Sequence, residues 1–338
     1  MGRASAVVAA LCLGAIALAL GATRAVERAH PGITRPEQEG FAPLRIPKLD
    51  VHQQVGHATL DMALQVAQVS GIGAFVNLSG GAEGGELEAQ LAAARPRENR
   101  VIVFMNLDAE GCCGDRWIAR EAARLARGKA LGARGLAILS EPPGAGLTSE
   151  RAEPLWEACA ALGLPVALGE LGLPEGRVRL LERHPRIDFI GTRFWGEPDP
   201  AKVTRLMDRL PNLWVDTAGR VQDLGSRRDA ARQAILAHPD RVLFGSDLRY
   251  VEGSGRQGII LGAGAPILLD SKLLGGEERR RFFARAFRFF ETRDAGIPGP
   301  GEGDASIAGI GLPRDVLRGI YHRNAERLLG VRAPEAVE

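Results

Sequence analysis

The chain has 338 residues, of which 45% are hydrophobic and 25% are charged, and its formal net charge is +2. This composition is that of a globular protein with a full core, and it excludes wholesale disorder. The small net charge, without a long run of one sign, also excludes a nucleic-acid platform, whose basic residues would gather on one face.

The N-terminus has the pattern of a targeting segment. Arg3 precedes an uncharged apolar run over residues 4–22, and the small residue Ala25 follows shortly after it. This pattern predicts a signal peptide over residues 1–25, or an N-terminal membrane anchor, since the run is just long enough to span a bilayer. Residues 26–45 contain Pro and Glu and are predicted to be a linker. We therefore expect an exported protein, periplasmic or extracellular, or one anchored in the membrane.

From residue 46 onward, short apolar runs alternate with stretches of helical period. Strands are predicted over residues 46–52, 72–78, 101–107, 135–139, 165–169, 187–194, 213–217 and 242–247. Helices are predicted over residues 59–70, 83–94, 116–132, 150–162, 174–183, 200–210 and 227–237. Strands that alternate with helices require parallel pairing, because parallel strands cannot be joined by tight turns. Eight such units predict an α/β fold, the (β/α)8 TIM barrel.

The last strand is followed by less regular sequence. Residues 253–276 are rich in glycine and predict a long irregular loop at the barrel rim before a helix over residues 277–292. A closing helix is predicted over residues 312–329, with Pro313 at its start and Gly330 just past its end. The predicted barrel domain therefore spans residues 46–330, and residues 331–338 form a tail.

The cysteines give little indication of function. Cys112 and Cys113 are adjacent, and adjacent cysteines rarely bridge each other, while no spacing typical of zinc sites is present. We interpret them as unremarkable small residues, although one bridge to Cys159 is permitted in an oxidising compartment.

Polar side chains lie where the predicted strands end, which is where barrel enzymes place their active sites. Asp50, His52 and Gln54 alternate along the first strand, so their side chains are expected to share a face, opposite Asp247 on the last strand. The other strand ends carry Asn77, Ser79, Asn106, Asp108, Ser140, Glu141, Gly169, Glu170, Arg193 and Asp216.

Several stretches are similar to the amidohydrolase-related (amidohydrolase 2) family of metal-dependent hydrolases and decarboxylases. The matching stretches are LDVH (49–52), ENRVIVFMNLD (98–108), LWEACAALGLPV (155–166), DFIG (188–191), NLWVDTA (212–218), DRVLFGSD (240–247) and LPRDVLRGIYHRNAERLLG (312–330). The resemblance implies a metallo-dependent TIM barrel in which a divalent cation, often zinc, activates water or polarises a small carbonyl or carboxylate substrate.

Carried over residue by residue, the resemblance implies that His52 and Asp247 are metal ligands and that Asp247 also acts as the catalytic base. The other histidines of the family pattern fall on Gln54, Gly169 and Arg193. A catalytic zinc site needs about three protein ligands, and an arginine side chain cannot coordinate metal. We expect Arg193 to fork onto Asp247 or Asp50.

Asp50 and Glu170 are left as substitute ligands, and Arg193, Glu170 and Gln54 are candidates for substrate binding. Histidines introduced together at Gly169 and Arg193 are expected to raise metal affinity.

Three functions stay open. The resemblance implies a metal-dependent hydrolase or decarboxylase of a small carbonyl or carboxylate compound. The competing hypothesis is a non-catalytic or ligand-binding relative in which Arg193 replaces the metal. The third is metal-free chemistry in which Arg193 binds a carboxylate or phosphate. All three predict a small-molecule partner and leave homo-oligomerisation open.

Overall fold

The computed structural model describes residues 41–97, 99–170, 174–253, 256–260, 269–270, 277–298 and 305–334. All but the first two of these residues belong to a compact unit that spans Pro43–Glu338. The predicted signal peptide or anchor, and the linker up to residue 40, lie outside the described residues. No helix in the described ranges is both long enough and apolar enough to cross a bilayer.

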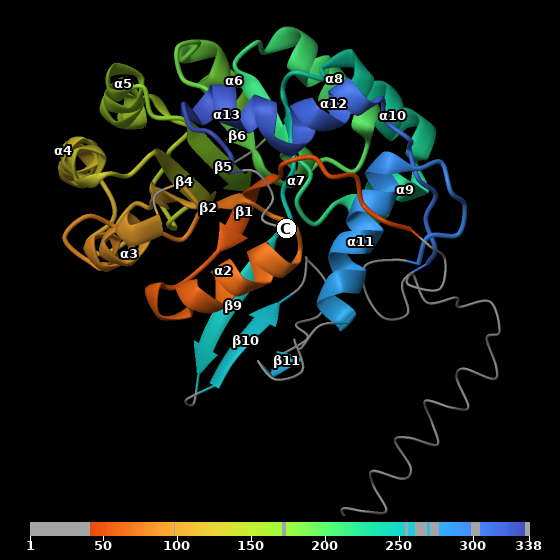
Figure 1. The fold of residues 1–338 in the computed structure, drawn as a ribbon. Helices are drawn as coiled ribbons and strands as arrows, with labels where there is room; N and C mark the ends of the chain where they lie inside the picture. Colours follow the sequence, from red (N-terminus) through yellow and green to blue (C-terminus); the bar gives the residue numbers. More distant parts are fainter. Residues whose placement is uncertain are drawn as a thin grey trace, which may run out of the picture. The chain divides into compact units, whose positions relative to one another are not determined.

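The predicted barrel is confirmed, with helices surrounding a curled parallel sheet (Figure 1). Neighbouring strands follow the order of the chain from β1 to β8, and every pair in this series is parallel. The strands are β1 (Leu49–Gln54), β2 (Ala74–Asn77), β3 (Val101–Met105), β4 (Gly135–Ser140), β5 (Val166–Glu170), β6 (Phe189–Gly191), β7 (Leu213–Asp216) and β8 (Val242–Leu243).

The predicted helices are present with small shifts at their ends. The helices that follow the strands are α2 (Leu60–Val69), α3 (Glu86–Ala94), α4 (Asp115–Leu131), α5 (Glu153–Leu162), α6 (Pro174–Arg183), α8 (Pro200–Arg209), α9 (Val221–Ser226), α10 (Arg228–Ala237) and α11 (Glu277–Glu291). The predicted closing helix consists of α12 (Arg314–Arg318), a π-helical turn (Gly319–Arg323) and α13 (Asn324–Leu329). Short 3-10 turns occur at His57–Thr59, Arg95–Arg97 and Glu150–Ala152.

The sheet closes between the first strand and the run that follows β8. The amide of Val51 donates to the carbonyl of Phe244 at 2.9 Å, and the amide of Asp247 donates to the carbonyl of His52 at 3.0 Å. The next strand, β9 (Leu248–Gly253), then pairs in parallel with β1. The first and eighth units are therefore neighbours, as a closed barrel requires.

Three expectations about segment boundaries are wrong. Residues 253–276 were expected to be irregular, yet they contain β10 (Arg256–Ile260), which pairs antiparallel with β9, and β11 (Leu269–Asp270). The predicted strands over residues 187–194 and 242–247 end early, at Gly191 and Leu243. In each of these two cases the chain turns into a left-handed backbone conformation within a few residues, which no strand can continue.

Residues of the last helix belong to one hydrophobic core cluster with residues of the strands. Leu49, Val76 and Trp214 pack in this cluster with Ala325 and Leu329 of α13. Val331 and Ala333, which were predicted to lie in a tail, pack against the same cluster. The described part of the predicted tail therefore belongs to the barrel, because it helps to cover apolar side chains of the strands.

A lysine just before β1 is buried in aromatic surroundings. The ammonium group of Lys48 lies 4.6 Å from the ring centroid of Phe287 and 5.0 Å from that of Tyr321, and it donates to the carbonyls of Leu44 and Ile46. Burial lowers the pKa of Lys48 from 10.5 to about 8, although the carboxylate of Glu291 opposes the shift.

This depressed pKa predicts a pH-dependent stability. The neutral amine is favoured in the folded state, so stability from this group is present above the unfolded pKa and is lost as the pH falls through about 8. Relative to Lys48→Met, the wild type should gain about 1.5 kcal/mol of unfolding free energy between about pH 8 and about pH 9.5, measured by urea unfolding. Lys202→Met, which removes an exposed lysine, is the control. An equal pH slope in wild type and Lys48→Met would contradict the assignment.

The expectation that Cys112 and Cys113 do not bridge each other is also wrong. The two residues form a disulfide in the loop between β3 and α4. Cys159 is free and buried, and burial raises the pKa of its thiol to about 12. Whether the two thiols can bond depends on the backbone conformation of this loop, and the neighbouring residue types do not reveal that conformation.

Candidate functional site

Four charged side chains form a network of alternating negative and positive charge at the C-terminal end of the barrel. Its members, in order of contact, are Asp216, His52, Asp247 and Arg193. The imidazole of His52 lies between two carboxylates, with Nδ1 at 2.9 Å from Asp216 Oδ2 and Nε2 at 3.4 Å from Asp247 Oδ1. Arg193 Nε donates to Asp247 Oδ2 at 3.0 Å, and Arg193 Nη2 donates to Asp247 Oδ1 at 2.9 Å. The predicted fork of Arg193 onto Asp247 is therefore confirmed, and so is the predicted proximity of His52 to Asp247.

The environment of His52 favours its protonated form. Burial opposes a charged imidazole, but the carboxylates of Asp216 and Asp247 outweigh burial and Arg193 and raise the pKa of His52. The side chains of His52, Asp216 and Asp247 are at most 1% exposed, whereas that of Arg193 is 37% exposed. With His52 protonated, the two cations and two anions balance, which is the condition under which buried charges are tolerated.

Asp216 makes contacts in this network that the sequence did not indicate. Its Oδ1 accepts hydrogen bonds from the amides of Arg193, at 2.8 Å, and Ala218, at 3.0 Å, while Oδ2 faces His52. Sequence reasoning placed Asp216 at a strand end but gave it no role. The sequence signal that could have revealed this role is the position of Asp216 in the matched stretch NLWVDTA.

Two of these four charged residues, Arg193 and Asp247, lie on strained backbone. Arg193, Phe194 and Trp195 have φ values of 52°, 55° and 64°, and Asp247 has a φ of 63°. Each non-glycine residue in the left-handed region costs about 1–2 kcal/mol, and such residues gather at functional sites. The left-handed turn over Thr192–Trp195 follows β6 directly, and the guanidinium of its second residue reaches Asp247.

Two glycines make room for the strained segments. A Cβ at Gly191 would overlap the indole of Trp195, so only glycine lets this ring fold back onto the end of β6. Gly219 has a φ of +64°, and a Cβ there would lie 2.9 Å from Asp247 Oδ2. Both positions therefore require glycine, the residue without a side chain.

The expected common face of Asp50, His52 and Gln54 is wrong for Asp50. A register shift between Asp50 and Gln53 interrupts the pairing of β1 with β2, which breaks the alternation of side chains. Asp50 Oδ2 accepts hydrogen bonds from Gln53 Nε2 at 2.7 Å and from Ser246 Oγ at 2.5 Å. Its Oδ1 accepts from the amides of His52 and Ser246. Asp50 thus fixes the segments on either side of the site instead of joining His52.

The remaining candidate residues are Gly169, Gln54 and Glu170. Gly169 sits in β5, where a Cβ would overlap the backbone of Leu139, so a histidine at this position would displace β4. The predicted gain in metal affinity from histidines introduced together at Gly169 and Arg193 would therefore require this part of β4 to move. Gln54 is partly exposed at the end of β1. The side chain of Glu170 lies outside the described residues.

The donor set of this site does not fit a divalent metal. Both carboxylate oxygens of Asp247 accept from the guanidinium of Arg193, whose positive charge repels a metal cation. Within the described ranges, no group of three or more His, Cys, Asp or Glu side chains is placed to hold a metal ion. A catalytic zinc needs about three such ligands.

Comparison with solved structures supports the fold. An uncharacterised TIM-barrel protein from Bordetella bronchiseptica superposes with a TM-score of 0.55 at 15% identity, over 85% of this chain and 99% of that one. A putative 2-pyrone-4,6-dicarboxylic acid hydrolase from Pseudomonas putida gives a TM-score of 0.53 at 18% identity, over 85% and 98%. A 2,6-dihydroxybenzoate decarboxylase from Rhizobium gives 0.53 at 15% identity, over 84% and 99%.

No curated protein sequence matches the chain. The family model described as "Amidohydrolase" (amidohydrolase 2) matches residues 35–331, which is nearly the whole barrel. This match agrees with the resemblance carried by the stretches around His52 and Asp247. The chain therefore belongs to the amidohydrolase 2 family.

Proposed function

We propose that this protein is a metal-independent member of the amidohydrolase 2 family that binds a small carboxylate at Arg193. The observation that carries the proposal is the bidentate pair of Arg193 with Asp247, which places a permanent cation beside the carboxylate that the resemblance assigns to the metal. Arginine matches the planar geometry of carboxylates and stays charged at any physiological pH.

The exposure of the side chains supports a binding function. Arg193 is 37% exposed, so its guanidinium can be reached from solvent while its inner edge stays on Asp247. Asp247 itself is fully buried and is engaged through both oxygens, so it serves as a counter-ion and not as a base for water.

The chemistry of the relatives supports the ligand class. The similar structures include a protein named for 2,6-dihydroxybenzoate and one named for 2-pyrone-4,6-dicarboxylic acid, both of which carry carboxyl groups. A carboxylate is also the group that a guanidinium binds with two parallel hydrogen bonds. We therefore expect a small mono- or dicarboxylate as the ligand.

A metal-dependent hydrolase or decarboxylase is the second candidate. The specific observation that favours it is the approach of His52 Nε2 to Asp247 Oδ1, because these two residues match the family's ligand positions. This function would require Arg193 to leave Asp247 when metal binds.

Metal analysis and ligand binding separate the two candidates. The purified protein is first incubated with excess zinc and then dialysed against buffer without zinc. It is expected to retain far less than one equivalent of zinc. Small carboxylates should raise its melting temperature, whereas the corresponding amides should not, and Arg193→Gln should abolish the rise. Stoichiometric zinc together with hydrolysis of a small ester or amide would refute the metal-independent proposal. If carboxylates stabilised wild type and Arg193→Gln equally, the ligand site would not be at Arg193.

A further inference from the structure

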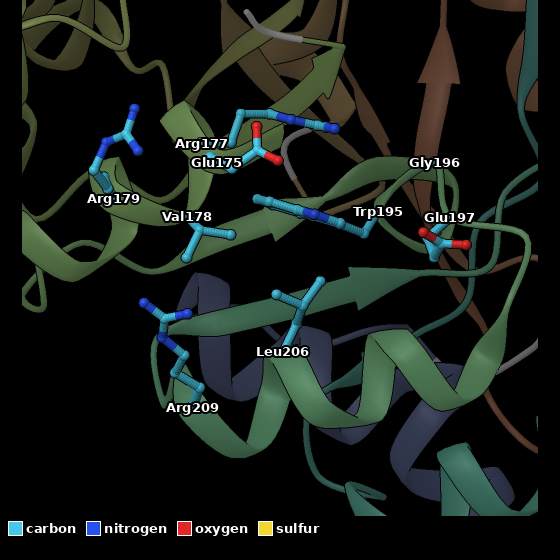
Figure 2. Close-up of a pocket in the computed structure, with 9 residues that line it drawn as sticks. All are labelled: Glu175, Arg177, Val178, Arg179, Trp195, Gly196, Glu197, Leu206 and Arg209. Atoms are coloured by element: carbon cyan, nitrogen blue, oxygen red, sulfur yellow. The ribbon is translucent and has the colours of Figure 1, made fainter. Parts of the chain in front are cut away.

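A pocket lies between α6 and α8 (Figure 2). It encloses about 440 Å³, which falls in the range of small-molecule sites. Residues from both helices and from the left-handed turn line it, whereas Arg193, His52 and Asp247 do not. The pocket is therefore distinct from the proposed carboxylate site.

The inner part of this pocket is apolar and is braced in place. Trp195 forms one wall, with Val178 of α6 and Leu206 of α8 beside it (Figure 2). Trp195 is only 4% exposed, so only an edge of its indole faces the pocket, and the guanidinium of Arg177 stacks over the ring at 4.8 Å while donating to the carbonyl of Gly169 at 3.2 Å. Val178 and Leu206 are partly exposed, so these two side chains, together with the edge of Trp195, form the apolar surface that a ligand can contact.

One end of the pocket is cationic. In Figure 2, Arg179 and Arg209 lie at the end away from Trp195. Arg209 Nε donates to Glu182 at 2.7 Å, and no ion pair of Arg179 occurs among the described residues. At the other end, the carboxylate of Glu197 is matched by Lys202, at 3.5 Å. The net positive charge therefore lies at the arginine end.

We propose that this pocket binds an amphipathic anion, with an apolar body against Val178, Leu206 and the edge of Trp195, and an anionic head between Arg179 and Arg209. The length of the pocket, from the indole across Val178 and Leu206 to the two guanidiniums, separates the apolar and charged parts of such a ligand. Carboxylate and phosphate heads share the chemistry that arginine recognises. Because Trp195 belongs to the turn that begins at Thr192, an occupant would contact the turn that carries Arg193.

The test uses four naphthalene probes that share one apolar body, with isothermal titration calorimetry of the full chain. 2-Naphthoate and 2-naphthyl phosphate should bind, and the tighter of the two identifies the head group. 2-Naphthol and 2-naphthylmethylammonium should bind at least about tenfold more weakly, because they lack the negative charge. Equal binding of all four probes would overturn the proposal.

Matched variants locate the bound probe. Arg179→Ala/Arg209→Ala should weaken binding of the anionic probes about tenfold, because two exposed charge contacts are lost. Trp195→Phe should also weaken it, since a smaller ring covers less of the probe. Arg116→Ala, which removes an exposed arginine on α4, should leave the affinity unchanged.

2-Naphthoate is itself a carboxylate and can bind at both sites, so its affinity is measured in Arg193→Gln, where the binding that remains should be lost when Arg179→Ala/Arg209→Ala is added. Loss of naphthoate binding in Arg193→Gln, with no effect of Arg179→Ala/Arg209→Ala, would refute the second site.

Discussion

Replacement of Arg193 by Met is expected to lower the free energy of unfolding by about 2–3 kcal/mol. The variant removes the two guanidinium donors from Asp247, whose side chain is 0% exposed, and leaves a buried carboxylate with His52 Nε2 at 3.4 Å. Breaking a fully buried ion pair costs about 3–5 kcal/mol, and we expect less because the Arg193 side chain is 37% exposed. Urea unfolding at neutral pH measures the loss.

A double-mutant cycle separates the ion pair from general packing. Asp247→Asn removes the charge but keeps a residue that tolerates the left-handed conformation with a φ of 63°. In Arg193→Met/Asp247→Asn no unpaired carboxylate remains, so the double variant should be more stable than the sum of the single effects predicts, by about 1–2 kcal/mol. If the two losses simply added, the pair would not be the coupling element that the geometry indicates.

Restoring imidazoles at two positions is expected to raise zinc affinity by at least about 100-fold. The variant is Gln54→His/Arg193→His, which removes the guanidinium from Asp247 and supplies imidazole nitrogens at two positions where the family pattern has histidine. A guanidinium about 4 Å from a doubly charged ion costs several kcal/mol even at an effective dielectric of about 20, and three or more ligands make a zinc site. Competition with a fluorescent chelator measures the affinity.

The matched control for this variant is Gln54→Asn/Arg193→Gln, which removes the same cation without adding imidazoles and should gain little zinc affinity. Adding Gly169→His to the gain-of-ligand variant should reduce folding yield, because a Cβ at this position overlaps the backbone of Leu139. Wild-type zinc affinity equal to that of Gln54→His/Arg193→His would show that Arg193 does not exclude the metal.

The strand-helix alternation and the strand-end residues could be predicted because they depend on local patterns. Apolar runs of five or so residues separated by helical periods leave few alternatives to a parallel sheet with covering helices. Chain order then places His52 on the first strand and Asp247 after the last, and closure of the barrel brings them together. Arg193 follows from the same logic, because it lies where the sixth strand ends.

The finer arrangement could not be predicted, because it depends on contacts between residues far apart in the chain. The β-bulge that separates Asp50 from His52 is fixed by hydrogen bonds from Ser246, almost two hundred positions away, which no periodicity along β1 reveals. Asp216 was visible at a strand end, but its two backbone donors come from segments that only the folded barrel brings together.

By itself, the sequence determined the (β/α)8 barrel and the meeting of His52, Asp247 and Arg193 at one end, since periodicity and strand order control these features. Its matching stretches, and not its periodicity, indicated the family. Only the tertiary structure decided how they meet. Trp195 packs on Gly191 and helps to shape a left-handed turn, and that turn directs Arg193 onto both oxygens of Asp247. The turn over Thr192–Trp195 is also held by hydrogen bonds from Thr192 to Leu168 of β5 and from the amide of Arg193 to Asp216 of β7, and these contacts do not exist until the strands have come together.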